Sequence, residues 1–347
     1  MNGSDPLVQQ LHAHPIDADA LRDRWKVGEA WQSTGVLEPV DIIVGKLMYR
    51  HAMQQEGRLY GFKLYSHYID GFNMHWLVNK APRKSRGTIL LLHGLSAEKA
   101  HWLKFARYFV KDYRIIIPDL PAHGQTGYQA GLSYSTASQA TRLVALLDHL
   151  GIATTHVLGN SMGGFIAARL ATDWPERITT LGLMDAAGLQ ARTHSVLVTA
   201  IETGRNPFIV HSVAEFNQLM NMAAHKQQWM PYQVRLMLAK QYANRRERLF
   251  DLFMQLQNEI YPVSWLEQRS RDLKLPTLLL WGDQDHLLNI DMLAHFADLI
   301  PQATAIKIAQ TGHMPMMERP LQTARYYRQF LKQAGIGLAR QATENHA

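Results

Sequence analysis

The chain has 347 residues, of which 47% are hydrophobic and 19% are charged. This composition is typical of a globular chain with a sizeable core and argues against disorder or a coiled coil. Lysine and arginine outnumber aspartate and glutamate by 36 to 29, which leaves a net charge of +7 and would suit an anionic partner. Cysteine is absent, which excludes disulfide scaffolds, thiolate metal sites and cysteine nucleophiles.

The start of the chain shows no basic segment followed by an apolar stretch, and the longest apolar runs are of strand length. We therefore expect no secretory signal and no membrane span. A soluble, cytoplasmic protein is the expectation, with peripheral contact at a membrane surface left open. The first 55 residues or so are predicted to be helical and do not belong to the alternation of strands and helices that follows.

From Thr88 onward, short apolar runs alternate with helical patterns, which predicts parallel strands joined by helical crossovers. Two leading strands, 59–69 and 74–78, are expected to be antiparallel. The later strands are predicted at 88–92, 114–118, 155–158, 178–184, 277–281 and 303–308, with helices at 97–111, 135–150, 162–172, 290–299 and 320–332.

The alternation breaks after residue 187, where a stretch of about 85 residues far exceeds an ordinary loop. Its periodicity predicts helices over 194–204, 212–226, 231–259 and 262–272. We therefore predict an α/β fold, a mostly parallel sheet flanked by helices with an inserted helical cap. The predicted parts are an N-terminal helical extension (1–57), the α/β domain (58–187 and 275–335) and the cap (188–274).

A Gly-x-Ser-x-Gly motif, Gly159 to Gly163, lies directly between a predicted strand and a predicted helix. In this context the chain must turn sharply at Ser161, which exposes its hydroxyl beside the N–H groups of the helix. The motif alone arises often by chance, and a plain glycine-rich turn is the alternative. The strand–turn–helix context favours a nucleophile.

A serine nucleophile needs a base, and the base needs an orienting acid. His313, after the last predicted strand, is the best-placed base among 17 histidines. Asp283 and Asp285 follow the preceding strand, and we favour Asp285 because a longer loop lets its side chain reach the imidazole; Asp283 is interpreted as a turn residue. The order Ser161, Asp285, His313 is that of the α/β-hydrolase arrangement.

Backbone N–H groups of Leu95 and Met162 are the candidates for the oxyanion hole, since they follow a strand end and the nucleophile. We place His93 and Met314 at the substrate-binding site, with His93 shaping its loop through side-chain hydrogen bonds. Flexible methionines gather in the cap and beside His313, and they suit an apolar cavity for chains of varied shape. Ordinary helix packing is the favoured explanation for any single one of them, whereas the cavity is the favoured explanation for the group beside His313. The candidates are Met220, Met222, Met230, Met237, Met254, Met314, Met316 and Met317.

Over residues 58–334 the chain resembles α/β-hydrolases of the monoacylglycerol lipase type, including the cold-adapted bacterial lipases. The stretches that carry the likeness are 93–99 with Trp102, 118–124 with Thr126, 159–164, 281–285, and 312–313 with 317–320. Ala122 departs from the family, which usually has glycine there. The resemblance implies the α/β-hydrolase fold and serine-dependent hydrolysis of lipidic acyl esters. In that reaction Ser161 attacks the ester carbonyl, His313 transfers the proton, and Asp285 orients the imidazole of His313.

No cofactor and no metal are expected, because no histidine–carboxylate spacing suggests a metal site. Nucleic-acid binding is not expected either, since no recognised module accompanies the positive charge. The expected partner is a small acyl ester or lipid.

Residues 40–50 could form an interfacial amphipathic helix, or equally a helix packed on the main domain. The alternatives to an acyl-ester hydrolase are a carbon–carbon bond hydrolase of the meta-cleavage product type and a non-catalytic receptor on the same fold. The sequence leaves the oligomeric state open.

Overall fold

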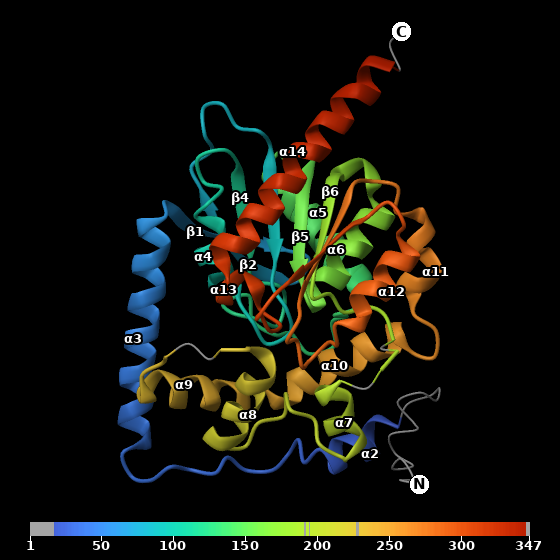
Figure 1. Cartoon of the computed structure of the whole chain (residues 1–347). Coiled ribbons are helices and arrows are strands. Elements are labelled where there is room, and N and C mark those ends of the chain that lie inside the picture. Colours follow the sequence, from blue (N-terminus) through green and yellow to red (C-terminus); the bar gives the residue numbers. More distant parts are fainter. Residues whose placement is uncertain (1–16, 191, 194, 227–228, 345–347) are drawn as a thin grey trace.

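The computed structural model describes residues 17–190, 192–193, 195–226 and 229–344 (Figure 1). They form an eight-stranded sheet with the strand order β1-β2-β4-β3-β5-β6-β7-β8. β2 runs antiparallel to both of its neighbours, and the remaining strands pair in parallel, which confirms the predicted mostly parallel sheet. The strands are β1 (Phe62–Ile69), β2 (Phe72–Asn79), β3 (Thr88–Leu92), β4 (Arg114–Pro118), β5 (Thr155–Asn160), β6 (Ile178–Met184), β7 (Thr277–Gly282) and β8 (Thr304–Ile308).

Helices cover both faces of this sheet, and the strands supply side chains to both sides. In β3, Leu90 and Leu92 belong to one core with α5, α6 and α12, whereas Ile89 and Leu91 belong to a second core with α4, α13 and α14. Burial on both faces explains why the central strands are apolar throughout rather than alternating. The helices are η1 (Lys99–Trp102), α4 (Leu103–Ala106), α5 (Thr136–His149), α6 (Met162–Asp173), η2 (Pro175–Arg177), α12 (Asp291–Leu299), α13 (Pro315–Glu318) and α14 (Pro320–Glu344).

The segment after β3 differs from its prediction as one helix over 97–111. It holds only η1 and α4, and then continues as tight turns in which Phe109 N–H donates to Ala106. Trp102, Phe105 and Phe109 are all buried against the sheet. The apolar spacing therefore indicated correctly which side chains pack inward, but short turns satisfy that spacing as well as one helix does.

Helices α7 to α11 occupy the chain between β6 and β7, and Figure 1 shows them gathered below the ends of the central strands. The segment 231–259, predicted as one helix, is two: α9 ends at Ala243 and α10 begins at Arg246. The break lets α9 pack along α3 while α10 supplies Leu252 and Leu256 to the main core. These helices are α7 (Val196–Glu202), α8 (Val213–Ala223), α9 (Tyr232–Ala243), α10 (Arg246–Ile260), α11 (Trp265–Arg269) and η3 (Ser270–Asp272).

The N-terminal part contains α2 (Ala18–Arg24) and α3 (Glu38–Leu59); residues 1–16 of the predicted extension lie outside the described residues. Leu21 of α2 packs into a hydrophobic cluster formed with α7, α8, α9 and α10. α3 lies along α9, where a Cβ on Gly45 would come within 2.0 Å of the Gln233 carbonyl oxygen, so glycine permits this close approach. No helix within the described part of the chain is long and apolar enough to cross a membrane.

Candidate active site

Ser161 lies at the sharp turn between β5 and α6, with φ +56° and ψ −121°. A non-glycine residue in this region is strained, and such strain persists only where the surrounding structure imposes it. The flanking glycines impose it here: a Cβ on Gly159 would lie 2.1 Å from the Gly163 carbonyl oxygen, and one on Gly163 would lie 2.3 Å from that of Leu92. The turn therefore holds the Ser161 side chain at the N-terminus of α6, as the motif predicts.

His313 and Asp285 come together from the loops after β8 and β7. Nδ1 of His313 lies 2.7 Å from Oδ2 of Asp285, and both side chains are buried. The other carboxylate oxygen accepts the N–H groups of Leu287 and Leu288 at 2.8 and 3.0 Å. Because Asp285 can only accept, Nδ1 of His313 carries the proton and its Nε2 lone pair is free to act as a base.

The second aspartate after β7 has a different place. Asp283 accepts the Thr311 N–H at 3.4 Å, while its own N–H donates to the Ile308 carbonyl. It thus joins the loop after β7 to the one after β8. This geometry agrees with the interpretation of Asp283 as a turn residue.

Asp185 is a third carboxyl group at this position, and the sequence reasoning missed it. It follows β6 and is fully buried, and its Oδ1 accepts the Gly282 N–H at 2.8 Å. Polar atoms of Asp185, Asp285 and His313 all lie within 4.8 Å of one another. Burial and the neighbouring Asp285 raise the pKa of Asp185 well above its usual value. A protonated Asp185 leaves a single negative charge beside the imidazole.

Several backbone contacts hold the His313 loop in place. Asn160, next to the nucleophile candidate, donates from Nδ2 to the His313 carbonyl at 3.0 Å. The His313 N–H donates to Ala223 of α8, and Glu318 accepts the Gly312 N–H at 3.0 Å. Glu318 also accepts the His225 N–H at 2.9 Å, so it links this loop to the chain after α8. The sequence drew attention to Asn160 and Glu318 only as parts of motifs.

The two candidate oxyanion donors lie at the same cavity as Ser161 and His313. Leu95 and Met162 both line it, and Met162 is the first residue of α6, where helix N–H groups have no partner within the helix. Both N–H groups are therefore available to a substrate oxygen by their positions in the chain.

His93 does not line this cavity, so its expected place at the substrate-binding site is wrong. Its ring is fully buried: Nε2 accepts the Leu120 N–H at 3.0 Å and Nδ1 lies 2.9 Å from the Gly94 carbonyl oxygen. Burial lowers the pKa of His93 to about 4, so the ring is neutral at neutral pH. His93 instead holds the loop that carries Leu95, which agrees with the expected role in shaping that loop.

Ala122, where the resembled family has glycine, adopts φ +70°. This left-handed conformation explains why glycine suits the position. The alanine is buried, and its N–H donates to the Gly127 carbonyl, so the turn forms despite the methyl group.

The cavity has two arms that meet at Ser161 and His313, with about 1010 and 1380 Å³ of space including the solvent at their mouths. The first, which we call the apolar arm, is lined by α7, α10 and the loop after β7, and Glu202 is the one acidic or basic side chain besides His313 among the described residues of its wall. The second, the polar arm, runs between α8, α9 and the loop after β3. Its wall carries Lys226, Arg235 and Arg245 together with Glu98 and Glu318.

Only some of the candidate methionines reach this cavity. Met220, Met230, Met314 and Met317 line the polar arm; contact of Met314 with a substrate stays a prediction. Met316 is buried in the core between the sheet and α14, and Met222, Met237 and Met254 are not among the lining residues. The pocket interpretation therefore fits half of the group, and ordinary packing explains the rest.

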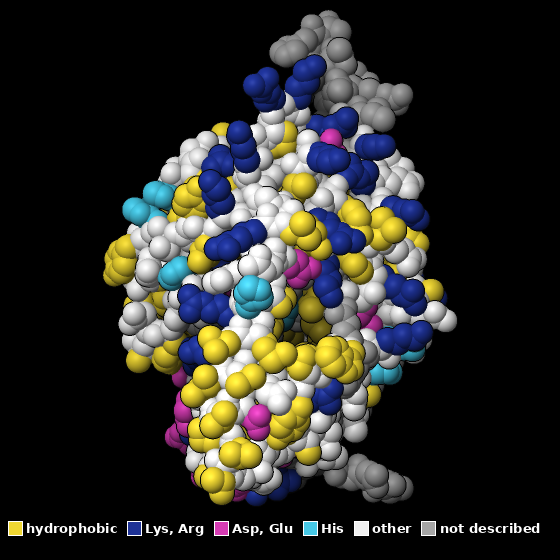
Figure 2. All heavy atoms as spheres, turned by 90° about the vertical axis from the view of Figure 1, so that its left-hand side faces the viewer, with side chains coloured by type: hydrophobic (Ala, Val, Ile, Leu, Met, Phe, Trp, Pro, Cys, Tyr) yellow, Lys and Arg dark blue, Asp and Glu magenta, His cyan; other side chains and the backbone are white. Residues whose placement is uncertain are grey.

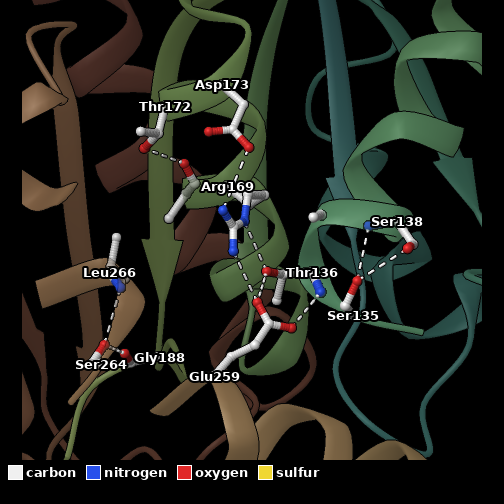
Figure 3. A network of polar contacts seen from close by, with 12 residues as sticks. Ser135, Thr136, Ser138, Arg169, Thr172, Asp173, Gly188, Glu259, Ser264 and Leu266 are labelled. Carbon is white, nitrogen blue, oxygen red and sulfur yellow. Dashed lines mark hydrogen bonds and ion pairs between the residues drawn. The ribbon is translucent and has the colours of Figure 1, made fainter. Parts of the chain in front are cut away.

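A polar network ties α10 to the main domain (Figure 3). Arg169 of α6 bonds Glu259 of α10 at 3.1 Å and the Thr136 hydroxyl at 3.1 Å, and the Thr136 N–H donates to Glu259 at 2.7 Å. The Arg169 guanidinium also lies 3.3 Å from the ring centre of Trp265. The ion pair is largely shielded from water, so it fixes α10 and with it one wall of the apolar arm.

Asp185, Asp285 and His313 are the residues in the described chain whose spacing could suit a metal ion. Both oxygens of Asp285 are already engaged, because Asp285 accepts three hydrogen bonds, one of them from His313 Nδ1. Asp185 accepts one through Oδ1, and its Oδ2 has no hydrogen-bond partner among the described residues. This donor set fits an orienting network for the imidazole better than an open coordination site.

Comparison with known proteins agrees with this geometry. The family model described as "Alpha/beta hydrolase family" matches residues 89–326. The chain belongs to this family. It is 30% identical to "Lipase 1" of Psychrobacter immobilis over 246 residues, which cover 70% of this chain and 76% of the lipase. It is 28% identical to "Monoacylglycerol lipase abhd6-A" of Xenopus laevis over 271 residues, 76% of this chain and 78% of that one.

A solved structure titled as a membrane phospholipase A, a bacterial virulence factor, matches with a TM-score of 0.79 and 31% identity. The match covers 84% of this chain and 92% of the other. The α/β-hydrolase fold predicted from the sequence is thereby confirmed, as is the resemblance to hydrolases of the lipase type.

Proposed function

We propose that this protein is a serine hydrolase that cleaves lipidic carboxylic esters, monoacylglycerols among them, with Ser161, His313 and Asp285 as its catalytic triad. The observation that carries the proposal is the buried His313–Asp285 hydrogen bond at the wall of a cavity that the strained Ser161 also lines. The similarity to lipases supports the ester as substrate.

The proposed reaction begins when Ser161 Oγ attacks the ester carbonyl carbon while Nε2 of His313 takes its proton. Asp285 holds the imidazole and stabilises its positive charge. N–H groups of Leu95 and Met162 donate to the oxyanion. The alcohol leaves with the proton from His313, and water then attacks the acyl-enzyme to release the acid and restore Ser161.

The two arms suggest how the ester lies. The apolar arm suits the acyl chain, because Leu197, Ile201 and Leu256 line it and burying a chain there removes hydrocarbon from water. The polar arm suits the alcohol, since its charged groups can meet a hydroxylated or anionic head. This assignment predicts a preference for lipidic over small charged esters.

The activity test compares p-nitrophenyl esters with a dienone substrate of meta-cleavage hydrolases, using wild type and Ser161→Ala. We expect ester turnover in the wild type, with kcat lower by about 10⁶ in Ser161→Ala, by analogy with other serine hydrolases. Turnover of the dienone alone supports the carbon–carbon hydrolase instead. A wild type without turnover of either substrate supports a non-catalytic receptor.

Chain-length selectivity tests the apolar arm through two valines of α7. Val198 lines this arm, whereas Val196 does not and is exposed. We expect Val198→Trp to lower kcat/KM for dodecanoyl esters by at least about tenfold relative to butanoyl esters, because the indole fills the arm. Val196→Trp is the matched control and leaves the ratio unchanged. Equal ratios in both variants would contradict the assignment of the arm.

A further inference from the structure

The outer side of α3 is apolar, although no described part of the chain covers it. Val40, Ile43, Val44 and Leu47 recur at helical spacing and are all exposed, Ile43 at 59% and Leu47 at 63%. Trp229 and Tyr232, at the start of α9, are also exposed, Trp229 at 87%. We call these six residues the α3 face. Figure 2, which views the molecule from this side, shows hydrophobic side chains gathered over the lower part of the surface.

The inner side of the same helix carries groups that ordinary amphipathic helices turn toward water. Glu38 is buried: it accepts the Thr34 N–H at 2.7 Å and lies 3.4 Å from the ammonium of Lys240. Gly45 fits against α9, and the Tyr49 hydroxyl donates to Glu98 in the loop after β3. α3 therefore buries a carboxylate and a glycine where it packs on the rest of the chain, while four of its apolar side chains stay exposed.

Cationic side chains lie beside the α3 face. Lys46 and Arg50 are exposed on α3, whereas Glu38 is turned inward and the half-buried Asp41 lies 3.4 Å from the Gln233 amide. In Figure 2, lysine and arginine side chains lie above the gathered hydrophobic ones, and acidic side chains lie among and beside them. Cationic side chains beside an apolar surface with exposed Trp and Tyr complement an anionic lipid surface.

The polar arm of the cavity reaches this side of the molecule. Its wall includes Tyr49 from α3, and Met230 and Arg235 from the segment that carries Trp229 and Tyr232. Figure 2 also shows the surface hollowed at the upper edge of the gathered hydrophobic side chains. A lipid surface in contact with the α3 face would therefore lie beside the entrance that leads to Ser161.

We propose that the α3 face docks on an anionic lipid surface and places the polar arm against it, so that an ester enters the site directly from lipid. The exposed apolar side chains enter the interface while Lys46 and Arg50 meet the anionic headgroups. This inference rests on the proposed function for its reason, since lipidic esters reside at such surfaces. Docking itself does not depend on hydrolysis.

The test is co-sedimentation with sucrose-loaded vesicles of phosphatidylcholine, with and without one quarter phosphatidylglycerol. We expect Ile43→Ser/Leu47→Ser to lower the partition coefficient about a hundredfold, because each side chain contributes roughly tenfold when buried in hydrocarbon. Lys46→Gln/Arg50→Gln should remove much of the gain from phosphatidylglycerol, about fivefold for each charge. Turnover of the dissolved ester p-nitrophenyl butyrate should stay unchanged in these variants.

Two valines provide a matched control, since Val40 is 58% exposed on the α3 face and Val263, after α10, is 56% exposed. Val40→Ser should weaken vesicle binding and Val263→Ser should not. Ser161→Ala protein should bind vesicles as the wild type does, which separates docking from hydrolysis.

Equal binding by the wild type and Ile43→Ser/Leu47→Ser, or an equal loss in Val263→Ser, would overturn the proposal. Light scattering measures whether the protein is a monomer or a dimer in solution. A dimer that Ile43→Ser/Leu47→Ser dissociates, together with no vesicle binding, would mean that a second copy of the chain covers this face.

Discussion

His313 lies close to two carboxyl groups whose surroundings differ. Asp285 accepts one hydrogen bond from the imidazole and two from backbone N–H groups. Asp185 lies deeper and accepts one N–H group, and burial together with the charge of Asp285 raises its pKa. Asp285 is therefore the carboxyl group that orients the imidazole, whereas burial favours the neutral form of Asp185.

This difference predicts unequal effects of removing each charge. Asp285→Asn should lower kcat for p-nitrophenyl butyrate by about 10⁴, because an amide cannot hold the same tautomer of His313 or stabilise its charge. Asp185→Asn should lower it by less than about tenfold, because an amide replaces a carboxyl group that is already neutral. Steady-state kinetics of the purified variants measure both effects.

Asp283→Asn is the matched control, because its amide oxygen can still accept the Thr311 N–H. It should retain activity close to that of the wild type. An Asp283→Asn variant as inactive as Asp285→Asn, or an Asp185→Asn variant as inactive as either, would contradict these roles.

The sequence led to Ser161, His313 and Asp285 because each follows a predicted strand, and the carboxyl ends of parallel strands meet at one edge of the sheet. The same reasoning could have led to Asp185, which directly follows β6 at that edge. It was overlooked because it belongs to no motif. His93 was misplaced because a histidine in a loop near the site can point inward as well as outward, and no local pattern distinguishes the two.

At the scale of elements, periodicity predicted the sheet better than the helices. Strands buried on both faces are continuous apolar runs, which are visible in the sequence. The break between α9 and α10 was not predicted, because it depends on α3 and the main core as separate partners. The bond between Arg169 and Glu259 joins residues 90 positions apart and has no local signature.

That bond predicts a stability difference between two ion pairs. Glu259→Ala should lower the free energy of unfolding by about 2–4 kcal/mol, because it leaves the shielded Arg169 with only the more distant carboxylate of Asp173, 3.6 Å away. Asp298→Ala removes a comparable pair with Arg192 whose side chains are 50% and 62% exposed, and should cost less than about 1 kcal/mol. Urea unfolding followed by circular dichroism measures both; equal losses would contradict the role of the network.

At the scale of the whole molecule, several histidines fold in the neutral form. Burial lowers the pKa of His93 and of His156 to about 4, and it also lowers those of His101 and His123. Between about pH 4 and 6.5 the unfolded chain binds protons that these folded rings do not. The free energy of unfolding should therefore be highest above pH 6.5 and fall as the pH drops toward 4.

Asp185 and Glu318 act in the opposite direction, because burial raises their pKa values and the folded state retains their protons. The four histidines outnumber them, so we expect lower stability at pH 5 than at pH 7 in urea unfolding. His156→Asn, which lies outside the cavity, should reduce the difference in the free energy of unfolding between pH 5 and pH 7. A wild type that is equally stable at both would contradict neutral burial of these rings.

The proposed hydrolysis depends on Ser161 as the nucleophile. The most direct measurement is intact-protein and peptide mass spectrometry after reaction with a fluorophosphonate. We predict one adduct per chain, located on Ser161, no adduct in Ser161→Ala, and much slower labelling in His313→Gln. Labelling of another residue, or ester hydrolysis at the wild-type rate by Ser161→Ala, would contradict it.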